Sequence, residues 1–240
     1  MTQPKVLIGV AHTQTVYADF MWSLMSVMGQ APAGTEILPI GSKTLIDAAR
    51  NQIAITAIDS RFTHVLFLDS DQTFMPDALN KLLSRDKDVI SGIYPQRTFF
   101  LHPVIYAKGV DKESDRAGYK HIISWDIKGG PFEIDMCGAG CLLIKTSVLQ
   151  KIGEPFFSSG VNSEGQYKGE DVYFCEKVKN AGYKLYADPT VTCGHLDTIE
   201  FTIEQFLAQR DRKKIFLKAN PKEAFTVKCK HCKKIGRAHV

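Results

Sequence analysis

The stretch His64-Val65-Leu66-Phe67-Leu68-Asp69-Ser70-Asp71 joins a short apolar run to two carboxylates that lie two residues apart. A short apolar run that ends in turn-forming residues is typical of a buried parallel strand. Side chains at i and i+2 of an extended backbone point the same way, so we expect Asp69 and Asp71 to face one partner. Like charges held together are costly unless a cation joins them, and oxygen ligands suit Mg²⁺ or Mn²⁺. An isolated Asp-x-Asp is most often a solvated turn. Here the strand before it favours a metal-bridged diphosphate site, because ligands of open α/β sheets bind at the carboxyl ends of the strands.

Strands and helices alternate around this run. In the first half, the residue pattern predicts strands at 5–11, 36–40, 64–68 and 88–92 and helices at 16–28, 44–58 and 76–83. In the second half it predicts strands at 141–145, 183–187 and 190–193, helices at 146–152, 170–181 and 201–219, and a Ser/Gly/Asn-rich loop at 157–169. The fold class we expect is therefore α/β, with a mostly parallel central sheet flanked by helices and a mixed second half. The Met and aromatic residues of 16–28 are expected to pack in the core.

Several functional classes lack their motifs in this sequence. It contains no Gly-x-Gly-x-x-Gly and no Gly-x-x-x-x-Gly-Lys, which argues against dinucleotide and P-loop chemistry. No apolar run approaches the ~20 residues of a transmembrane helix, so we expect no transmembrane segment. Six cysteines without the layout of a signal peptide indicate reduced thiols and a cytoplasmic protein. Four of them stand among apolar or small residues and are expected to fill the core: Cys137, Cys141, Cys175 and Cys193.

Positive charge is concentrated in the tail of the chain. Residues 210–240 hold eleven Lys/Arg and two Asp/Glu, whereas residues 1–209 hold 19 and 24. A basic tail is able to bind nucleic acid or anionic lipid, but a solvated end explains it equally well, and we do not expect nucleic acid as a partner. The expected organisation is a main domain at 1–198, an amphipathic helix at 199–220 and a basic tail at 221–240.

The tail also carries half of a zinc-ribbon pattern. Cys229-Lys230-His231-Cys232 supplies one Cys pair, whereas a structural Zn²⁺ takes four ligands and no second pair follows. His239 is available, but it belongs to Ile-Gly-Arg-Ala-His-Val at 235–240, which one reading frame of a common sequencing adapter encodes. We expect these six residues to be an assembly artefact and the natural sequence to continue, with a second Cys pair that would complete a zinc site.

Two further motifs place polar residues at the ends of predicted elements. Gly169-Glu170-Asp171 opens the predicted helix at 170–181. The helix dipole favours carboxylates in a first turn, and this alone accounts for them. Cys193-Gly194-His195 follows a predicted strand. A lone His is usually structural, but its neutral imidazole can bind a metal ion that carboxylates already hold.

In chain order, these motifs resemble those of a nucleotide-sugar glycosyltransferase of the GT-A fold, family-2-like. They are the strand with Asp-x-Asp, then Gly-Ala-Gly-Cys-Leu-Leu-Ile at 138–144, then Gly-Glu-Asp-Val-Tyr-Phe-Cys-Glu-Lys-Val-Lys-Asn-Ala-Gly-Tyr at 169–183, and Gly-His at 194–195. Asp47-Ala48-Ala49-Arg50-Asn51 resembles the helix that precedes the family's metal motif. The similarity covers about residues 5–197. It implies a Rossmann-like GT-A sheet and a metal-dependent, inverting transfer of a sugar from a nucleoside-diphosphate sugar to an acceptor hydroxyl on a glycan, lipid or protein.

The resemblance also implies roles for individual residues. Asp69 and Asp71 match the motif that holds a divalent cation, Mn²⁺ or Mg²⁺, and His195 matches a further metal ligand. Glu170 and Asp171 match an acidic pair on the acceptor side, with Asp171 as the general base. Contacts with the donor nucleotide are implied for Ala11, His12, Thr13, Arg50, Asn51, Asp69 and Ser70.

Further expectations concern the surroundings of this site. Gly138 and Gly140 would let the backbone approach sugar or acceptor, and the loop at 157–169 would close over the donor. Arg97 is a candidate for contact with donor or acceptor, but we expect it to be an ordinary surface arginine. Two other functions remain open. A nucleotidyltransferase would need a Gly-rich basic loop after the first strand, where Ala-His-Thr-Gln-Thr stands. A non-catalytic binding module would use the basic, Cys-containing tail.

Overall fold

The chain separates into two compact units, Met1–Asp197 and Thr198–Val240, in a computed structural model. The structure describes residues 3–13, 15–41, 45–98, 101–109, 118–126, 128–161, 165 and 167–197, and the backbone at 226–228 and 235–237. In the second unit, β15 (Thr226–Lys228) and β16 (Ile235–Arg237) pair antiparallel. The expected helix at 201–219 and the Cys229–Cys232 pair with His239 lie outside the described residues.

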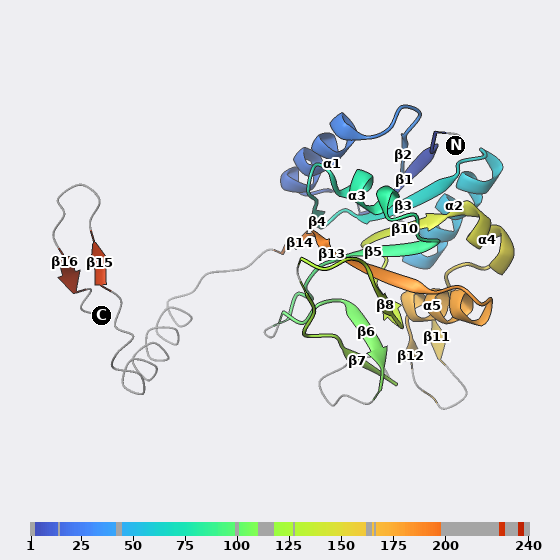
Figure 1. Ribbon diagram of the computed structural model, residues 1–240. Coiled ribbons are helices and arrows are strands. Elements are labelled where there is room, and N and C mark those ends of the chain that lie inside the picture. The colour runs from blue at the N-terminus through green and yellow to red at the C-terminus, as the bar shows by residue number, and fades with distance from the viewer. Residues whose placement is uncertain are drawn as a thin grey trace. The chain divides into compact units, whose positions relative to one another are not determined.

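A seven-stranded sheet in the order β2-β1-β3-β10-β5-β13-β8 forms the centre of the first unit (Figure 1). Its strands are β1 (Val6–His12), β2 (Glu36–Gly41), β3 (His64–Asp69), β5 (Val89–Ile93), β8 (Phe132–Ile134), β10 (Cys141–Lys145) and β13 (Leu185–Thr192). Five strands run in one direction, whereas β10 runs antiparallel between β3 and β5, and β8 runs antiparallel at one edge. The sheet is thus mostly parallel in strand direction, as expected, and two antiparallel strands make it mixed.

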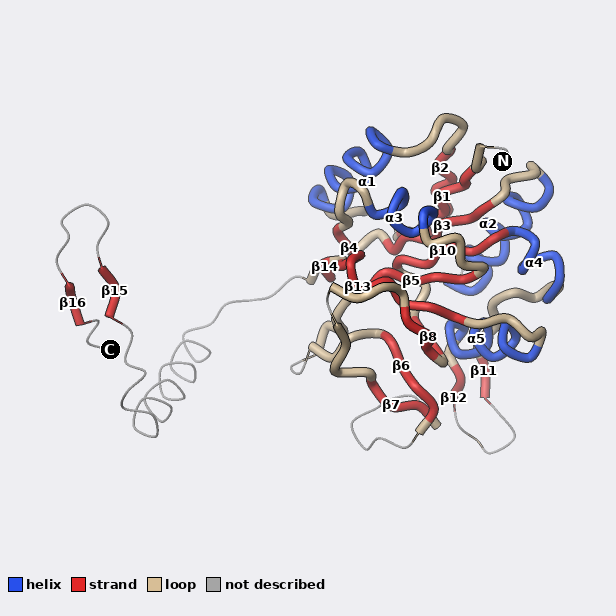
Figure 2. The backbone as a smooth tube through the Cα atoms, in the orientation of Figure 1, coloured by secondary structure: helices blue, strands red, loops and turns tan. Residues whose placement is uncertain are grey.

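Five helices of the described residues cover the two faces of this sheet (Figure 2). They are α1 (Ala18–Gln30), α2 (Ile46–Asp59), α3 (Ala78–Ser84), α4 (Thr146–Ile152) and α5 (Glu170–Asn180). Helices α2, α4 and α5 pack together on one face, and α1 and α3 pack on the other. The sheet is thus the middle layer of three, as the alternating strands and helices of the sequence predict.

The apolar run of the opening stretch lies at the centre of the core. Val65, Leu66, Phe67 and Leu68 are all buried, because helices cover both faces of β3. Strand β3 lies between β1 and β10, so its backbone is paired on both sides. Full burial of a large apolar side chain contributes about 1.5–3 kcal/mol. The end of β3, where Asp69 lies, is therefore held by a fully buried strand that is paired on both sides.

Three small sheets surround the central one. Strands β7 (Tyr119–His121), β6 (Ile105–Lys108) and β9 (Met136–Cys137) form a three-stranded sheet, and β11 (Gly160–Val161) pairs with β12 (Tyr167–Lys168). Strand β4 (Gln72–Thr73) pairs antiparallel with β14 (Gly194–His195). This last pairing sets His195 opposite Gln72, one residue after Asp71. Residues more than 120 positions apart are thereby joined next to the end of β3.

Some expectations differ from the structure in detail. Helix α1 buries Phe20, Leu24 and Val27, but Trp22 and Met25 are exposed, so the expected burial of all its Met and aromatic residues is wrong. The two strands expected between 183 and 193 are one strand, β13, with an irregular register between Ala187 and Thr192. The loop expected at 157–169 contains the short strands β11 and β12.

Cysteine burial agrees with the sequence. Cys137, Cys141, Cys175 and Cys193 are buried free thiols, so their expected core-filling role is confirmed. Among the described helices, none has the length and apolarity needed to cross a membrane.

Close contact between β1 and α2 gives a first prediction. A Cβ at Gly9 would lie 2.2 Å from Ile53 Cγ2, whereas a Cβ at Gly29 in α1 meets nothing within 4 Å. We expect Gly9→Ala to lower the free energy of unfolding by about 1–3 kcal/mol. Gly29→Ala should raise it by about 0.5–1 kcal/mol, because Gly is a poor helix former. Urea denaturation measures both. In the double variant Gly9→Ala, Ile53→Ala, the loss should be smaller than the sum of the single losses. Equal effects of the two Gly→Ala changes would contradict this packing.

Candidate functional site

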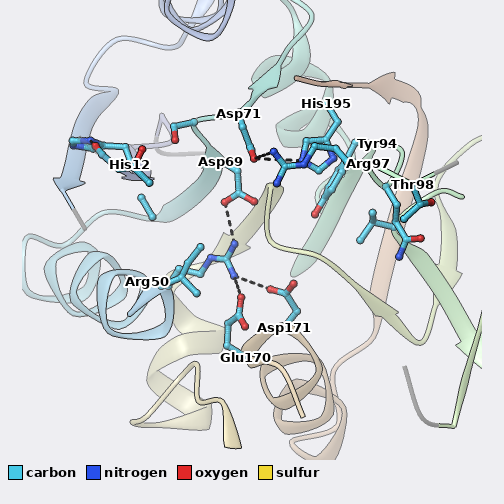
Figure 3. Close-up of a pocket in the computed structure, with 16 residues that line it drawn as sticks. His12, Arg50, Asp69, Asp71, Tyr94, Arg97, Thr98, Glu170, Asp171 and His195 are labelled. Carbon is cyan, nitrogen blue, oxygen red and sulfur yellow. Dashed lines mark hydrogen bonds and ion pairs between the residues drawn. The ribbon is translucent and has the colours of Figure 1, made fainter. Parts of the chain in front are cut away.

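A cavity of ≈ 490 Å³ opens where β1, β3 and β5 end and where α2 and α5 begin (Figure 3). Residues from six separate parts of the sequence line it. The residues singled out in the sequence that line this pocket are Ala11, His12, Thr13, Arg50, Asp69, Ser70, Asp71, Glu170, Asp171 and His195. The lining also includes six residues that were not assigned to the site: Ile46, Tyr94, Gln96, Arg97, Thr98 and Val104.

Arg50 is the centre of an ion-pair cluster at the base of the pocket. Its Nη1 donates to Glu170 Oε1 at 2.6 Å and to Asp171 Oδ1 at 2.9 Å, and its Nη2 donates to Asp69 Oδ1 at 3.0 Å. The Arg50 side chain is only 3% exposed. Burial by itself lowers the pKa of Arg50, but the three carboxylates outweigh it, and the pKa lies above its ordinary value. One formal positive charge faces three negative ones, so the cluster stays negative overall.

The N-terminus of α5 stabilises the two carboxylates that this helix contributes to the cluster. Glu170 and Asp171 form its first turn, and Lys177 and Lys179 lie in its last turn. Both placements complement the helix dipole, so the helix end accepts two adjacent carboxylates at little cost. Arg50 then joins this helix end to Asp69 at the end of β3, which fixes the positions of the two elements relative to each other.

Asn51 supports Arg50 from outside the pocket. Its Nδ2 donates to the Phe157 carbonyl at 2.7 Å, and its Oδ1 accepts from the Phe156 and Phe157 amides at 2.8 and 3.0 Å. The ring of Phe157 lies 5.8 Å from the guanidinium carbon of Arg50 and stacks on Phe174. The amide of Asn51, expected to contact a donor, thus holds the loop that supports Arg50, and Asn51 is not part of the pocket lining.

Asp71 faces a second set of partners. Its Oδ2 lies 3.0 Å from Arg97 Nη1 and 3.5 Å from His195 Nε2. Burial alone raises the pKa of Asp71, but His195 and then Arg97 lower it below its ordinary value. The contact with Asp71 in turn raises the pKa of His195. Arg97, expected to be an ordinary surface arginine, is therefore a pocket residue with an ion pair.

Asp69 and Asp71 consequently point to different partners (Figure 3). Strand β3 ends at Asp69, and Asp71 lies in the turn that follows. Because the extended backbone does not continue, the rule that i and i+2 side chains share a face no longer applies. The expectation that the two carboxylates face one partner is wrong. Within the described residues, no group of three or more His, Cys, Asp or Glu side chains is arranged to hold a metal ion.

Asp71 and His195 nevertheless offer a donor pair that fits a divalent cation. His195 Nδ1 lies 2.8 Å from the Pro95 carbonyl oxygen, which only accepts hydrogen bonds, so Nδ1 carries a proton. In the neutral imidazole, the lone pair is then on Nε2, which faces Asp71 Oδ2. Such a backbone contact is a usual way to orient a metal-binding histidine. A cation would have to compete with a proton for His195 Nε2 and with Arg97 for Asp71 Oδ2.

Tyr94 and two glycines close the inner wall of the pocket. The Tyr94 hydroxyl accepts from the Gly140 amide at 3.2 Å. Burial, and then the charges of Asp69 and Asp171, raise the pKa of Tyr94 well above its ordinary value, so its phenol is neutral. A Cβ at Gly138 would lie 2.0 Å from the Tyr94 hydroxyl oxygen, and one at Gly140 would lie 2.9 Å from Asp69 Oδ2. These glycines therefore make room for protein side chains; the expected close approach of sugar or acceptor is not needed to explain them.

Gln72 carries an unusual buried amide beside this wall. The side chain is completely buried, and neither Nε2 nor Oε1 has a hydrogen-bond partner among the described residues. A Cβ at Gly140 would lie 2.1 Å from Gln72 Nε2. A buried amide without partners costs free energy, and such groups are rare in folded proteins.

Four of the six unassigned lining residues share one position in the fold. Tyr94, Gln96, Arg97 and Thr98 follow β5 at the same sheet edge as Asp69. The predicted parallel strand at 88–92 already places its carboxyl end at the same edge of the sheet as the Asp-x-Asp. Position at the strand end was thus the available signal for these four residues.

Comparison of the sequence with models of known protein families and with curated proteins found no match. Solved structures with a similar fold exist. They include A197 from STIV, with a TM-score of 0.56 and 19% identity over 81% of this chain and 86% of that one. They also include GalNAc-T7 with UDP, GalNAc and Mn²⁺, with a TM-score of 0.54 and 13% identity over 82% of this chain and 45% of that one. At these identities the similarity is one of fold, and it agrees with a mixed α/β, GT-A-like architecture.

The Arg50 cluster gives a prediction about stability. Arg50→Met removes the positive charge that three carboxylates share, so we expect the free energy of unfolding to fall by about 3–5 kcal/mol. Arg50→Lys keeps the charge but loses the planar fork, so it should recover only part of this loss. Urea denaturation of both variants at pH 7 provides the measurement. An Arg50→Met protein as stable as the parent would show that the ion pairs do not hold α5 to β3.

The buried amide gives another prediction. Gln72→Leu removes a group that has no partner and keeps most of the side-chain volume. We expect the free energy of unfolding to stay unchanged or to rise by about 1 kcal/mol, because the desolvation cost of the amide disappears. Thermal and urea denaturation measure the change. A loss above about 2 kcal/mol would mean that the amide does make a stabilising contact.

Proposed function

We propose that this protein transfers a sugar from a nucleoside-diphosphate sugar to an acceptor hydroxyl, with the help of a divalent cation. One observation carries the proposal: Asp71, Asp171 and His195, from three distant parts of the sequence, line a single pocket at the strand ends of a GT-A-like fold. These are the residues whose motifs resemble those of family-2-like glycosyltransferases. Their meeting in one pocket supports a common purpose for the three motifs.

The donor half of the pocket is proposed to lie along the ends of β1 and β3. The nucleoside would contact Ala11, His12 and Thr13, and Asp69 and Ser70 would lie beside the ribose and diphosphate. Asp71 and His195 would hold the cation, for which Mn²⁺ or Mg²⁺ is proposed from the resemblance and from the carboxylate oxygen of Asp71, which suits both ions. When bound, such an ion stabilises the negative charge that develops on the departing diphosphate. The UDP and Mn²⁺ bound by GalNAc-T7 support this choice of ligands.

Asp171 is proposed as the general base of the transfer. The acceptor hydroxyl gives its proton to the Asp171 carboxylate while its oxygen bonds to the anomeric carbon and the nucleoside diphosphate leaves. Arg50 holds Asp171 Oδ1 and Glu170 Oε1 on the same Nη1, so it fixes the orientation of both carboxylates. Arg50 acts as a positioning residue, since it is buried beneath the cluster. Inversion at the anomeric carbon follows from a single displacement with such a base.

Binding of nucleoside diphosphates tests the donor half. We expect thermal stabilisation by at least one of UDP, GDP, ADP, CDP and dTDP in the presence of Mn²⁺ or Mg²⁺, and little without the cation. Asp71→Asn should lose the cation-dependent part of the affinity, about tenfold or more, because a charge-assisted contact disappears. Asp59→Asn is the matched control, since Asp59 is an exposed carboxylate at the end of α2 and does not line the pocket. Binding that Asp71→Asn leaves unchanged would contradict the assignment.

Transfer activity tests the acceptor half. Asp171→Asn should bind the nucleoside diphosphate as tightly as the parent, while cation-dependent release of nucleoside diphosphate from the matching sugar donor falls by about 10²-fold or more. Because Asn can still accept from Arg50, the fold should survive, and circular dichroism checks this. Full activity in Asp171→Asn would remove Asp171 from the mechanism, and Glu170→Gln would then identify the base.

A further inference from the structure

Arg97 occupies the position where a cation would have to bind. Its Nη1 lies 3.0 Å from Asp71 Oδ2, the same oxygen that lies 3.5 Å from His195 Nε2. One carboxylate oxygen therefore faces both a guanidinium and an imidazole. Two positive charges cannot share this oxygen without repelling each other, so an incoming divalent ion and Arg97 compete for it.

We propose that Arg97 is an exchangeable counter-ion of Asp71, an inference that rests on the proposed function. The divalent cation would displace Arg97 from Asp71, and the released guanidinium would bind the donor diphosphate. The assignment gives Arg97 two effects of opposite sign. It weakens binding of the cation alone, and it strengthens binding of the diphosphate once the cation is in place.

The two arginines of the pocket differ in the way this exchange requires. Arg50 is 3% exposed and donates to three carboxylates, so its position is fixed. The Arg97 side chain is 41% exposed and pairs with the carboxylate of Asp71. Its contact with the Leu196 carbonyl is long, at 3.4 Å. An exposed ion pair contributes only about 0.2–1 kcal/mol, so a divalent ion can replace it at small cost.

The diphosphate gives the released guanidinium a partner. Arg97 lies on the segment after β5 that lines the pocket beside Asp71. Without Arg97, the charged side chains that line the pocket are dominated by Asp69, Asp71, Glu170 and Asp171, against the single fixed charge of Arg50. A diphosphate entering such surroundings needs further positive charge besides the cation. The planar fork of Arg matches phosphate oxygens.

The test compares Arg97→Gln with the parent, using two probes. Mn²⁺ alone is titrated by electron paramagnetic resonance, and the tightest nucleoside diphosphate from the binding screen is titrated by calorimetry at saturating Mn²⁺. We expect Arg97→Gln to bind Mn²⁺ about two- to fivefold more tightly. It should bind the nucleoside diphosphate about tenfold more weakly.

Two controls isolate the proposed exchange. Arg61→Gln removes the same charge from an exposed residue outside the pocket lining and should leave both affinities unchanged. In the Asp71→Asn background, Arg97→Gln should no longer increase Mn²⁺ affinity. Without the Asp71 carboxylate, Arg97 and the ion have no shared partner for which to compete.

The outcomes separate this inference from the proposed function. If the parent binds no nucleoside diphosphate with Mn²⁺, the function and the inference both fail. If the parent binds it but Arg97→Gln binds Mn²⁺ no more tightly, or the diphosphate no more weakly, the inference fails and the function stands. Opposite changes in the two affinities support the exchange.

Discussion

The site depends on one buried guanidinium. Arg50 ties Asp69 at the end of β3 to Glu170 and Asp171 at the start of α5. Burying a charge is costly unless it is paired and hydrogen-bonded, and here three carboxylates supply that pairing. The same contacts gather negative charge at the base of the pocket. The ion pairs of Arg50 thus set the position of Asp171, the proposed general base. They also leave a net negative charge that a cation in the pocket would balance.

Charge in the pocket is arranged in two tiers. The lower tier is fixed, because Arg50 is buried against the Phe157 ring and Asn51 holds the loop that carries this ring. The upper tier is partly exposed and consists of Asp71 with its two partners, Arg97 and His195. A fixed lower tier and an exchangeable upper tier suit a ligand that brings its own charges. A metal–diphosphate complex is such a ligand.

Much of this arrangement could be predicted from the sequence. The apolar run at 64–68 specified the buried strand β3, and the three motifs around Asp71, Asp171 and His195 specified residues that line one pocket. Local pattern could not specify the direction of β10, because an apolar strand buried on both faces looks the same in either direction. Nor could it show that Asp71 lies past the end of β3, where the two carboxylates turn to different partners. The burial of the Gln72 amide opposite His195 depends on β4 pairing with β14, a contact between distant segments that no local signal encodes.

The central claim is that groups from distant segments surround one cation together with a diphosphate. Pulsed electron paramagnetic resonance of Mn²⁺ bound with the nucleoside diphosphate tests it most directly, because couplings identify the nuclei next to the ion. The account predicts couplings to phosphorus and to one imidazole nitrogen, with the nitrogen coupling lost in His195→Ala. Phosphorus coupling without any nitrogen coupling, the same as for the Mn²⁺–nucleotide complex free in solution, would contradict it.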